Sequence, residues 1–363
     1  MVIRGSQVQI SLARPHELGP DEIAAWHSMQ RTTGSLANPF MSPEFAVAIS
    51  RFRADARIAV LTDGPEVVGF FPFEKRRFGV GVPIGAGLSN RHGLIHVPAI
   101  EWDPGGLLRA CKLSVWQFDY LAEGQRPFEH YAAAVTPSAL IDLTDGFASY
   151  KEKLSVKSPR LCKNMDRNTY ELARDVDELR YVVDSRDMAG LRTLMTWKSA
   201  QCRRKGWFDG FDRPWIVDVV DYLFNTRSDR FMGLLSLLYA GDIPVAAQFG
   251  LRFDGLFAGW FTAYDARYAK YSPGLLQFMR MAEDLAAAGI HMIDLGSPPS
   301  SYKERLQSRD ILVAEGMVIK GPLGASMHRA RRAVAGCADH QIRQHRVMFR
   351  VADGLLRHYG RIG

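Results

Sequence analysis

The chain has 363 residues, of which 47% are hydrophobic and 23% charged, and its formal net charge is +7 at pH 7. This length and apolar content exclude a disordered or low-complexity protein and are sufficient for two cores of ordinary size. The sequence shows neither a basic leader with an apolar core nor an apolar run of about eighteen residues, so we expect a cytoplasmic protein without signal peptide or membrane span.

The first expected elements are two helices and a β-hairpin. Apolar residues at helical spacing predict helices over residues 20–31 and 42–52. Two apolar runs on either side of the Asp63-Gly64 turn predict a hairpin over residues 57–73.

A glycine-rich run follows the hairpin. Its glycines, from Gly79 to Gly87, fit no dinucleotide-binding fingerprint, so we expect a loop. The loop leads to His92, which is a candidate general base that would act from across an interdomain cleft. The alternative interpretation of His92 is an ordinary surface or turn residue.

Lysines and arginines are dense over residues 151–170. This segment is expected to lie between two domains, either as a solvated helix face or as a grip for an anionic substrate. Under the second interpretation Lys157, Arg160, Lys163 or Arg167 would face the cleft, and Arg160 is our candidate for bidentate contact with a phosphate.

The second half repeats the pattern of the first. Helices are predicted over residues 187–205 and 213–225, and a hairpin over residues 231–249 turns at Ala240-Gly241-Asp242. Duplication of one α/β unit explains both halves most economically, although such hairpins are common in α/β proteins.

Residues 255–295 predict a strand, a turn, a helix and a second strand. Ser272 is suited to the N-cap and Pro273 to the first helical position, and Gly289 is suited to the helix end. Asp294 lies in the second strand. A βαβ unit with this turn offers backbone N–H groups and a helix dipole to an anion such as a phosphate.

The segment from Pro322 onward carries eight arginines and two aspartates, and so most of the net charge. Its apolar spacing is helical and partly amphipathic. A helix packed on the second domain and a helix on an anionic membrane surface are both consistent with this pattern. DNA binding is not expected, and tRNA is relevant only to the aminoacyl alternative described below.

Four short motifs together resemble the GNAT-type acetyltransferase domain of the CelD-like group of cellulose and exopolysaccharide biosynthesis proteins. These motifs are Tyr264-Asp265, Tyr271-Ser272-Pro273-Gly274, Asp294-Leu295-Gly296 and Tyr302-Lys303. The CelD-like group is related to the FemAB aminoacyltransferases, which are tandem GNAT proteins, and the resemblance covers roughly residues 140–320. The chain departs from the family's pyrophosphate loop, of which only Gly274 remains.

The resemblance implies an α/β fold with a mixed α+β sheet, built from two tandem GNAT-like domains and a basic helical tail. The expected parts are an acceptor-side domain (1–150), a basic interdomain segment (151–180), a domain with the acyl-donor site (181–321) and the tail (322–363).

The resemblance also implies acetyl-CoA or another acyl-CoA as co-substrate. Candidate donor contacts are Tyr271, Ser272, Gly274, Leu275, Gly259 and Phe261. Candidate acceptor contacts are Arg160, Trp197, Gln248 and Tyr264. No metal is expected, because the four cysteines are far apart and form no Cys/His cluster.

Four residues are the candidates for catalysis. Asp294 is the candidate base, since burial at a strand end can raise a carboxyl pKa, but it could equally cap the following turn or pair with Lys303. Lys303 could stabilise an oxyanion or hold a phosphate, and Tyr302 could protonate a leaving thiolate. His92 is the fourth candidate.

The leading hypothesis is an acyl-CoA-dependent N- or O-acyltransferase that acts on a sugar or sugar nucleotide for an exopolysaccharide or the cell envelope. A FemAB-like enzyme with an aminoacyl-tRNA donor is one alternative. The other is a non-catalytic scaffold of a polysaccharide synthesis complex, which the eroded pyrophosphate loop favours.

Overall fold

The structure is a computed structural model that describes residues 8–98, 100–296 and 300–319. We call residues 8–142 the first half and residues 143–319 the second half. The first half contains β1 (Gln9–Ala13), α1 (Pro20–Thr32), α2 (Pro43–Phe52), β2 (Ala56–Asp63), β3 (Glu66–Lys75), β4 (Val80–Pro83), β5 (Ile95–His96), α3 (Pro104–Ala110), β6 (Val115–Leu121), α4 (Arg126–Glu129) and β7 (Ala132–Asp142). The second half contains α5 (Gly146–Lys157), α6 (Pro159–Asp175), β8 (Leu179–Val182), α7 (Met188–Arg204), α8 (Pro214–Asn225), β9 (Phe231–Ala240), β10 (Ile243–Phe253), β11 (Leu256–Tyr264), α9 (Pro273–Ala287), β12 (Met292–Gly296), α10 (Ser301–Leu306) and β13 (Arg309–Ile319).

Apart from the short strand β5, both halves contain the same succession of a strand, two helices, three strands, a helix and a strand. In the first half these are β1, α1, α2, β2, β3, β4, α3 and β6, and in the second β8, α7, α8, β9, β10, β11, α9 and β12. In the first half β4 pairs in parallel with β6, with β5 and α3 between them in the chain, and in the second half β11 pairs in parallel with β12 across α9. The predicted helices and hairpins are confirmed, and their common order supports duplication.

Both hairpins turn through a glycine with left-handed backbone angles. β2 and β3 are joined at Gly64, with φ of 58°, and β9 and β10 at Gly241, with φ of 59°. Glycine reaches this left-handed region without the steric cost that a Cβ brings, so a two-residue connection can form. These local signals explain why the hairpins were predictable from sequence.

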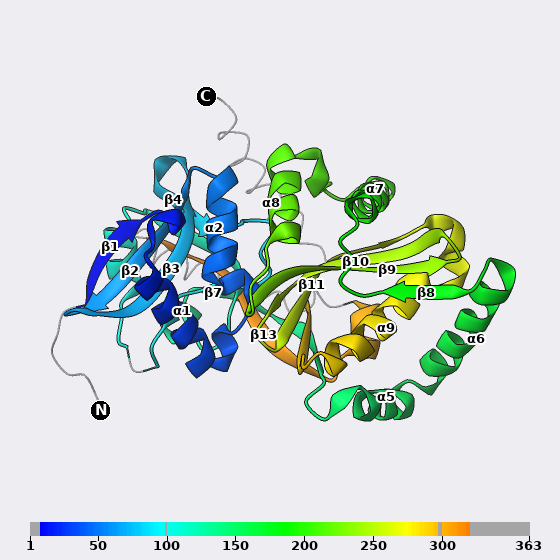
Figure 1. Cartoon of the computed structure of the whole chain (residues 1–363). Coiled ribbons are helices and arrows are strands. Elements are labelled where there is room, and N and C mark those ends of the chain that lie inside the picture. The colour runs from blue at the N-terminus through cyan, green and yellow to red at the C-terminus, as the bar shows by residue number, and fades with distance from the viewer. Residues whose placement is uncertain (1–7, 99, 297–299, 320–363) are drawn as a thin grey trace.

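All strands belong to one thirteen-stranded sheet, in which the halves exchange their last strands. β7 of the first half pairs with β12 of the second half, whereas β13 of the second half pairs with β6 of the first. β7 and β13 also pair with each other, and they lie between the two groups of strands (Figure 1). Each half therefore completes the sheet of the other.

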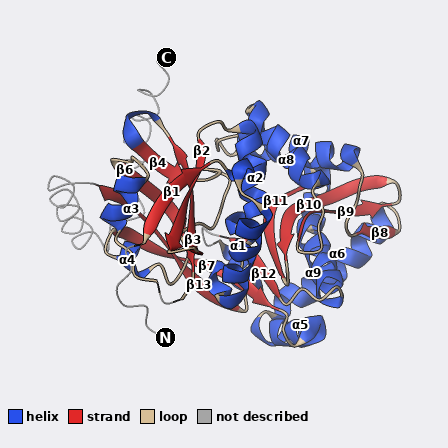
Figure 2. Cartoon of the chain, turned by 60° about the vertical axis from the view of Figure 1, so that its left-hand side comes forward, coloured by secondary structure: helices blue, strands red, loops and turns tan. Residues whose placement is uncertain are grey.

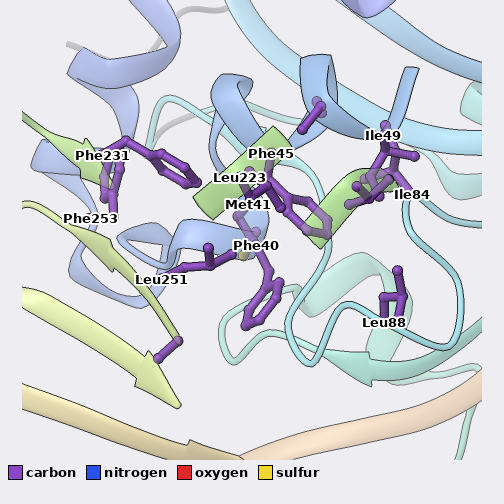
Figure 3. Packing of buried hydrophobic residues seen from close by; sticks show 14 of the residues in the cluster. Phe40, Met41, Phe45, Ile49, Ile84, Leu88, Leu223, Phe231, Leu251 and Phe253 are labelled. Atoms are coloured by element: carbon purple, nitrogen blue, oxygen red, sulfur yellow. The ribbon is translucent and has the colours of Figure 1, made fainter. Parts of the chain in front are cut away.

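A shared hydrophobic core joins the halves. α1 and α2 lie between the two groups of strands (Figure 2), and α2 packs against α8. Figure 3 shows Phe40, Met41 and Phe45 of the first half close to Leu251 and Leu223 of the second, and these five side chains are buried in one cluster. Burial of a large apolar side chain contributes about 1.5–3 kcal/mol, so this contact is a substantial part of the molecule's stability.

The opposite face of strands β9 to β11 is covered by α9, as Figure 1 shows, and α5 and α6 pack against α9. The basic segment therefore packs against α9. The reason is its apolar stripe, because Leu154, Leu161, Met165 and Leu172 are buried in the same cluster as α9.

The structure corrects one local expectation, that of a loop over the glycine-rich run. Part of the glycine-rich run forms β4, which pairs with β3 and β6.

The basic tail over residues 322–363 lies outside the described residues. Among the helices that the structure describes, none is long and apolar enough to span a bilayer.

Candidate functional site

β11 and β12 diverge in the second half. They pair in parallel over three positions, of which the last joins Ala258 to Asp294. β11 then continues to Tyr264, whereas β12 ends at Gly296. We call residues 259–264 of β11 together with residues 295–296 of β12 the β11–β12 fork. Along the fork, the described residues provide no strand partner on the β12 side of β11, so backbone groups there are available to a ligand.

A β-bulge lies at the start of the fork. Phe261 pairs with Phe249, whereas Gly259 pairs with Gly250, so Trp260 is the extra residue. Phe261 stacks on Trp260 with ring centroids 4.8 Å apart. A bulge bends its strand and increases the local twist, which accounts for the separation of β11 from β12.

The N-terminus of α9 follows the fork. Ser272 has left-handed backbone angles (φ 53°, ψ 48°), and its side chain makes no capping hydrogen bond, so the position of the predicted N-cap is confirmed but its side-chain contact is not. Its carbonyl accepts from the N–H of Leu275 at 2.9 Å. A Cβ on Gly274 would lie 3.4 Å from Cδ1 of Tyr264, which is ordinary contact. Pro273 has no N–H, and the N–H groups of Leu275 and Leu276 donate to the Ser272 carbonyl, so the first-turn N–H that suits an anion is that of Gly274.

Asp294 is the centre of a buried polar network between the halves. Its Oδ2 accepts from Arg91 at 2.7 Å and from Asn38 Nδ2 at 3.1 Å, and its Oδ1 accepts from the N–H of Gly296 at 2.7 Å. Asp294 and Arg91 are 1% and 2% exposed. The carboxylate therefore caps the turn at Gly296, as one interpretation expected, but its ion pair is with Arg91. The geometry favours this structural interpretation over a general base.

Lys303 reaches the end of β12 from α10. Its Nζ donates to the carbonyl of Gly296 at 2.9 Å. Burial lowers the pKa of Lys303, the charge of Asp294 opposes this effect, and the nearby charge of Lys198 adds to it. The ammonium is thus placed beside the fork in a partly desolvated environment, where its interaction with an anion is strong.

The three candidate tyrosines lie around α9 in different environments. Tyr302 packs edge-on against Phe278, and burial raises its pKa. The hydroxyl of Tyr271 donates to Asp175 at 2.7 Å, which ties it to α6. Tyr264 is partly buried beside Gly274.

The candidate acceptor and donor contacts are not all in one place. Gln248 is 3% exposed and lies over Gly259, where a Cβ would meet its Nε2 at 2.9 Å. Trp197 is partly buried against the shared core, and Leu275 against the core under α9. Gln248 therefore lies beside the fork at Gly259, whereas Arg160 is exposed on α6.

His92 is buried in the first half. Its Nε2 accepts from the N–H of Tyr120 at 3.2 Å, and its ring packs edge-on against Trp116. Burial, assisted by the charge of Arg91, lowers the pKa of His92 to about 3. Its catalytic role stays a prediction, and these surroundings do not favour it, because the lone pair that would take a proton is already engaged.

The structure thus brings Gly259, Gln248, Asp294, Lys303 and the α9 N-terminus together around the fork. The first half contributes residues that sequence reasoning missed. Arg91 and Asn38 bind Asp294, and the carbonyl of Leu88 accepts from Trp260 Nε1 at 2.9 Å. The only signal was the polar turn that contains His92. Lys198 was missed as well, since one lysine on a helix carries no signal.

In the first half, the helix that corresponds to α9 in the repeat is α3, and a side chain caps its N-terminus. α3 begins after Asp103, whose Oδ2 accepts from the N–H of Gly106 at 2.6 Å. A negative charge already occupies this helix end, which disfavours a second anion there. The two halves therefore differ at the position where the second half offers its anion-holding turn.

We compared the sequence with protein-family models and the fold with solved structures. Residues 160–304 match the family model described as "Acetyltransferase (GNAT) domain". The C-terminal DUF2156 domain of a putative lysylphosphatidylglycerol synthetase from Agrobacterium fabrum superposes with a TM-score of 0.52 at 11% identity, over 86% of this chain and 96% of that chain.

Two further structures have similar folds. L-PGS from Bacillus licheniformis gives a TM-score of 0.51 at 12% identity, over 88% of this chain and 96% of that chain. FemX gives a TM-score of 0.50 at 10% identity, over 75% of this chain and 90% of that chain. At these identities the likeness is one of fold, and it confirms the mixed α/β, GNAT-like architecture. A search of curated protein sequences found no match.

Proposed function

We propose that this chain is an acyltransferase that binds an acyl-CoA at the β11–β12 fork and the N-terminus of α9. The observation that carries the proposal is the divergence of β11 from β12, directly followed by an uncapped helix start, within the residues that match the GNAT family model. The pantetheine chain would pair with the free edge of β11, and the pyrophosphate would lie at Gly274.

The chemistry requires an oxyanion to be stabilised and a proton to be removed from the attacking amine or hydroxyl. Lys303 is our candidate for stabilising the oxyanion, because its Nζ lies at the end of β12. Tyr302 is our candidate for protonating the leaving thiolate. Asp294 would hold Arg91 and the end of β12 in position, because both of its oxygens already accept hydrogen bonds. The described residues contain no group of three His, Cys, Asp or Glu that could hold a metal ion.

The acceptor expected from the CelD-like resemblance is a sugar or sugar nucleotide of exopolysaccharide or cell-envelope synthesis. An aminoacyl donor is the second candidate. It is favoured by the fold shared with a protein described as a putative lysylphosphatidylglycerol synthetase, a name that refers to an aminoacylated lipid. A scaffold without catalysis would need no donor at all.

The decisive experiment is calorimetric titration of the full chain with acetyl-CoA, together with Gly274→Asp. The room around Gly274 tolerates the new Cβ, and an acidic residue in the first turn of a helix is favourable, so the variant should fold. Its carboxylate would repel the pyrophosphate. Gly34→Asp is the matched control, because Gly34 has no heavy atom within 4 Å of its Cβ position and lies in the first half.

We expect micromolar binding that Gly274→Asp weakens at least about tenfold and that Gly34→Asp leaves unchanged. Binding unaffected by Gly274→Asp would move the donor to another place. If the unmodified chain binds no acyl-CoA, titration with aminoacyl-tRNA separates the aminoacyl alternative from the scaffold.

A further inference from the structure

Lys198 is a partly buried cation beside the fork. It projects from α7, and its Nζ contacts Oε1 of Gln201 at 3.1 Å and the carbonyl of Thr262 in β11 at 3.5 Å. Burial lowers its pKa. Within the part of the chain that the structure describes, Lys198 has no carboxylate partner, so its charge is balanced only by neutral oxygens.

Lys198 and Lys303 each contact a different strand of the fork. Lys198 contacts β11 at Thr262, and Lys303 contacts β12 at Gly296, both beyond the last paired residues of these strands. The charge of Lys198 is one of the causes that lower the pKa of Lys303. Two like charges in a partly buried site repel each other unless an anion lies near both.

The carboxylate of Asp294 is shared between Lys303 and a buried arginine. Asp294 is the acidic side chain that acts on Lys303, but it is paired at 2.7 Å with the buried guanidinium of Arg91. Among these four side chains three are cations and one is an anion. These four side chains together therefore carry a net positive charge, in addition to the helix dipole of α9.

We propose that Lys198 and Lys303 together bind an anionic group of the acceptor, a phosphate or a carboxylate, beside the reacting carbonyl. This inference rests on the proposed function, because the acyl group is placed in the fork. An acceptor with a sugar phosphate or a carboxylate would be held by two charge-assisted hydrogen bonds. A lysyl or other cationic group would be disfavoured at the same place.

The test is isotope-coded acetylation of lysines in the full chain with acetic anhydride, read by mass spectrometry. Inorganic phosphate and acetate are the probes, and sodium chloride at equal ionic strength is the reference. We expect phosphate, acetate or both to protect Lys198 and Lys303. Exposed Lys153, which pairs with Asp145, should react equally in all three salts. The more protective probe identifies the anion class.

Substitution shows whether the two lysines form one site. In Lys198→Met, about tenfold more phosphate should be needed to protect Lys303, because one of two charged contacts is lost. Lys198→Arg should keep most of the protection, and Lys153→Met should keep all of it. Protection of Lys303 that is indifferent to Lys198→Met would overturn the shared site, and so would equal protection of Lys153.

The outcome is separable from that of the donor experiment. Gly274→Asp should lose acetyl-CoA binding but retain protection of Lys198 by phosphate, because Gly274 lies at the helix start and not at the lysines. If acetyl-CoA does not bind and phosphate still protects both lysines, the donor assignment fails and the anion site stands. If acetyl-CoA binds and no anion protects the lysines, the anion site fails alone.

Discussion

At the scale of single residues, the pair of Arg91 and Asp294 joins segments that are 203 residues apart in the chain. Removal of one partner of a buried ion pair leaves the other charge without compensation, which costs about 3–5 kcal/mol. We expect Arg91→Met to lower the free energy of unfolding by this amount. The double variant Arg91→Met/Asp294→Asn should recover much of the loss, because neither member of the pair is then charged. Urea unfolding of both variants measures the coupling.

The same pair tests the catalytic interpretation of Asp294. If Asp294 only positions Arg91 and β12, the double variant should retain a measurable rate of acyl transfer once its fold is restored. If Asp294 is the general base, the rate should fall by about 10²–10⁴ even in a well-folded double variant. Comparison of the rate with the free energy of unfolding separates the two roles.

His92 predicts a dependence of stability on pH. Its pKa falls from 6.5 to about 3 on folding, chiefly through burial, and the carboxylate of Asp119 at 3.5 Å does not offset this. Between pH 6.5 and pH 3 the imidazole of His92 is therefore protonated in the unfolded chain but neutral in the native state. Its contribution to the free energy of unfolding is fully present above pH 6.5 and is lost progressively as the pH falls toward 3. Between pH 7 and pH 5 the loss should be about 2 kcal/mol.

The control for this dependence is His92→Gln, whose amide oxygen can accept from Tyr120 but carries no charge at any pH. Urea unfolding at pH 7, 6 and 5 should show a smaller loss in His92→Gln than in the unmodified chain, by about 2 kcal/mol at pH 5. Equal losses in the two proteins would mean that His92 is protonated in the native state.

At the scale of elements, local patterns predicted what is local. The hairpins at Gly64 and Gly241 and the βαβ unit around Pro273 follow from turn chemistry and periodicity, and all three are present. The exchange of β7 and β13 was not predictable, because a strand's own alternation does not specify a partner strand so distant in sequence. The candidate site was located from the Ser-Pro-Gly turn, whereas its contacts from the first half depend on that tertiary packing.

Gly316 tests how tightly the exchanged strand β13 is held. A Cβ at this position would lie 2.1 Å from the backbone carbonyl of Tyr131, just before β7, and backbone cannot move aside as a flexible side chain can. We expect Gly316→Ala to lower the free energy of unfolding by about 1–3 kcal/mol, measured in urea. Gly34→Ala is the control, since its Cβ position is open. A neutral Gly316→Ala would show that β13 can shift in register.

At the scale of the whole molecule, strand exchange and the shared core make each half depend on the other. Without β13 the first half would expose the edge of β6, and without β7 the second half would expose the edge of β12. The core around Phe40 and Leu251 would also be opened. Unpaired edges and exposed apolar surface favour aggregation over independent folding. The molecule should therefore unfold in one cooperative transition, although the sequence repeat leads us to expect two separate domains.

Division of the chain tests this dependence. Expressed alone, residues 1–142 and 143–363 should each be insoluble or lack a cooperative urea transition, whereas co-expression should give a soluble complex of both pieces. This follows because β7 and β13 would still find their partners in the other piece. The undivided chain should show coincident transitions by tryptophan fluorescence and by far-ultraviolet circular dichroism. A cooperatively folded 143–363 piece would contradict mutual dependence and would assign the fork, α9 and Lys303 to a domain that is complete by itself.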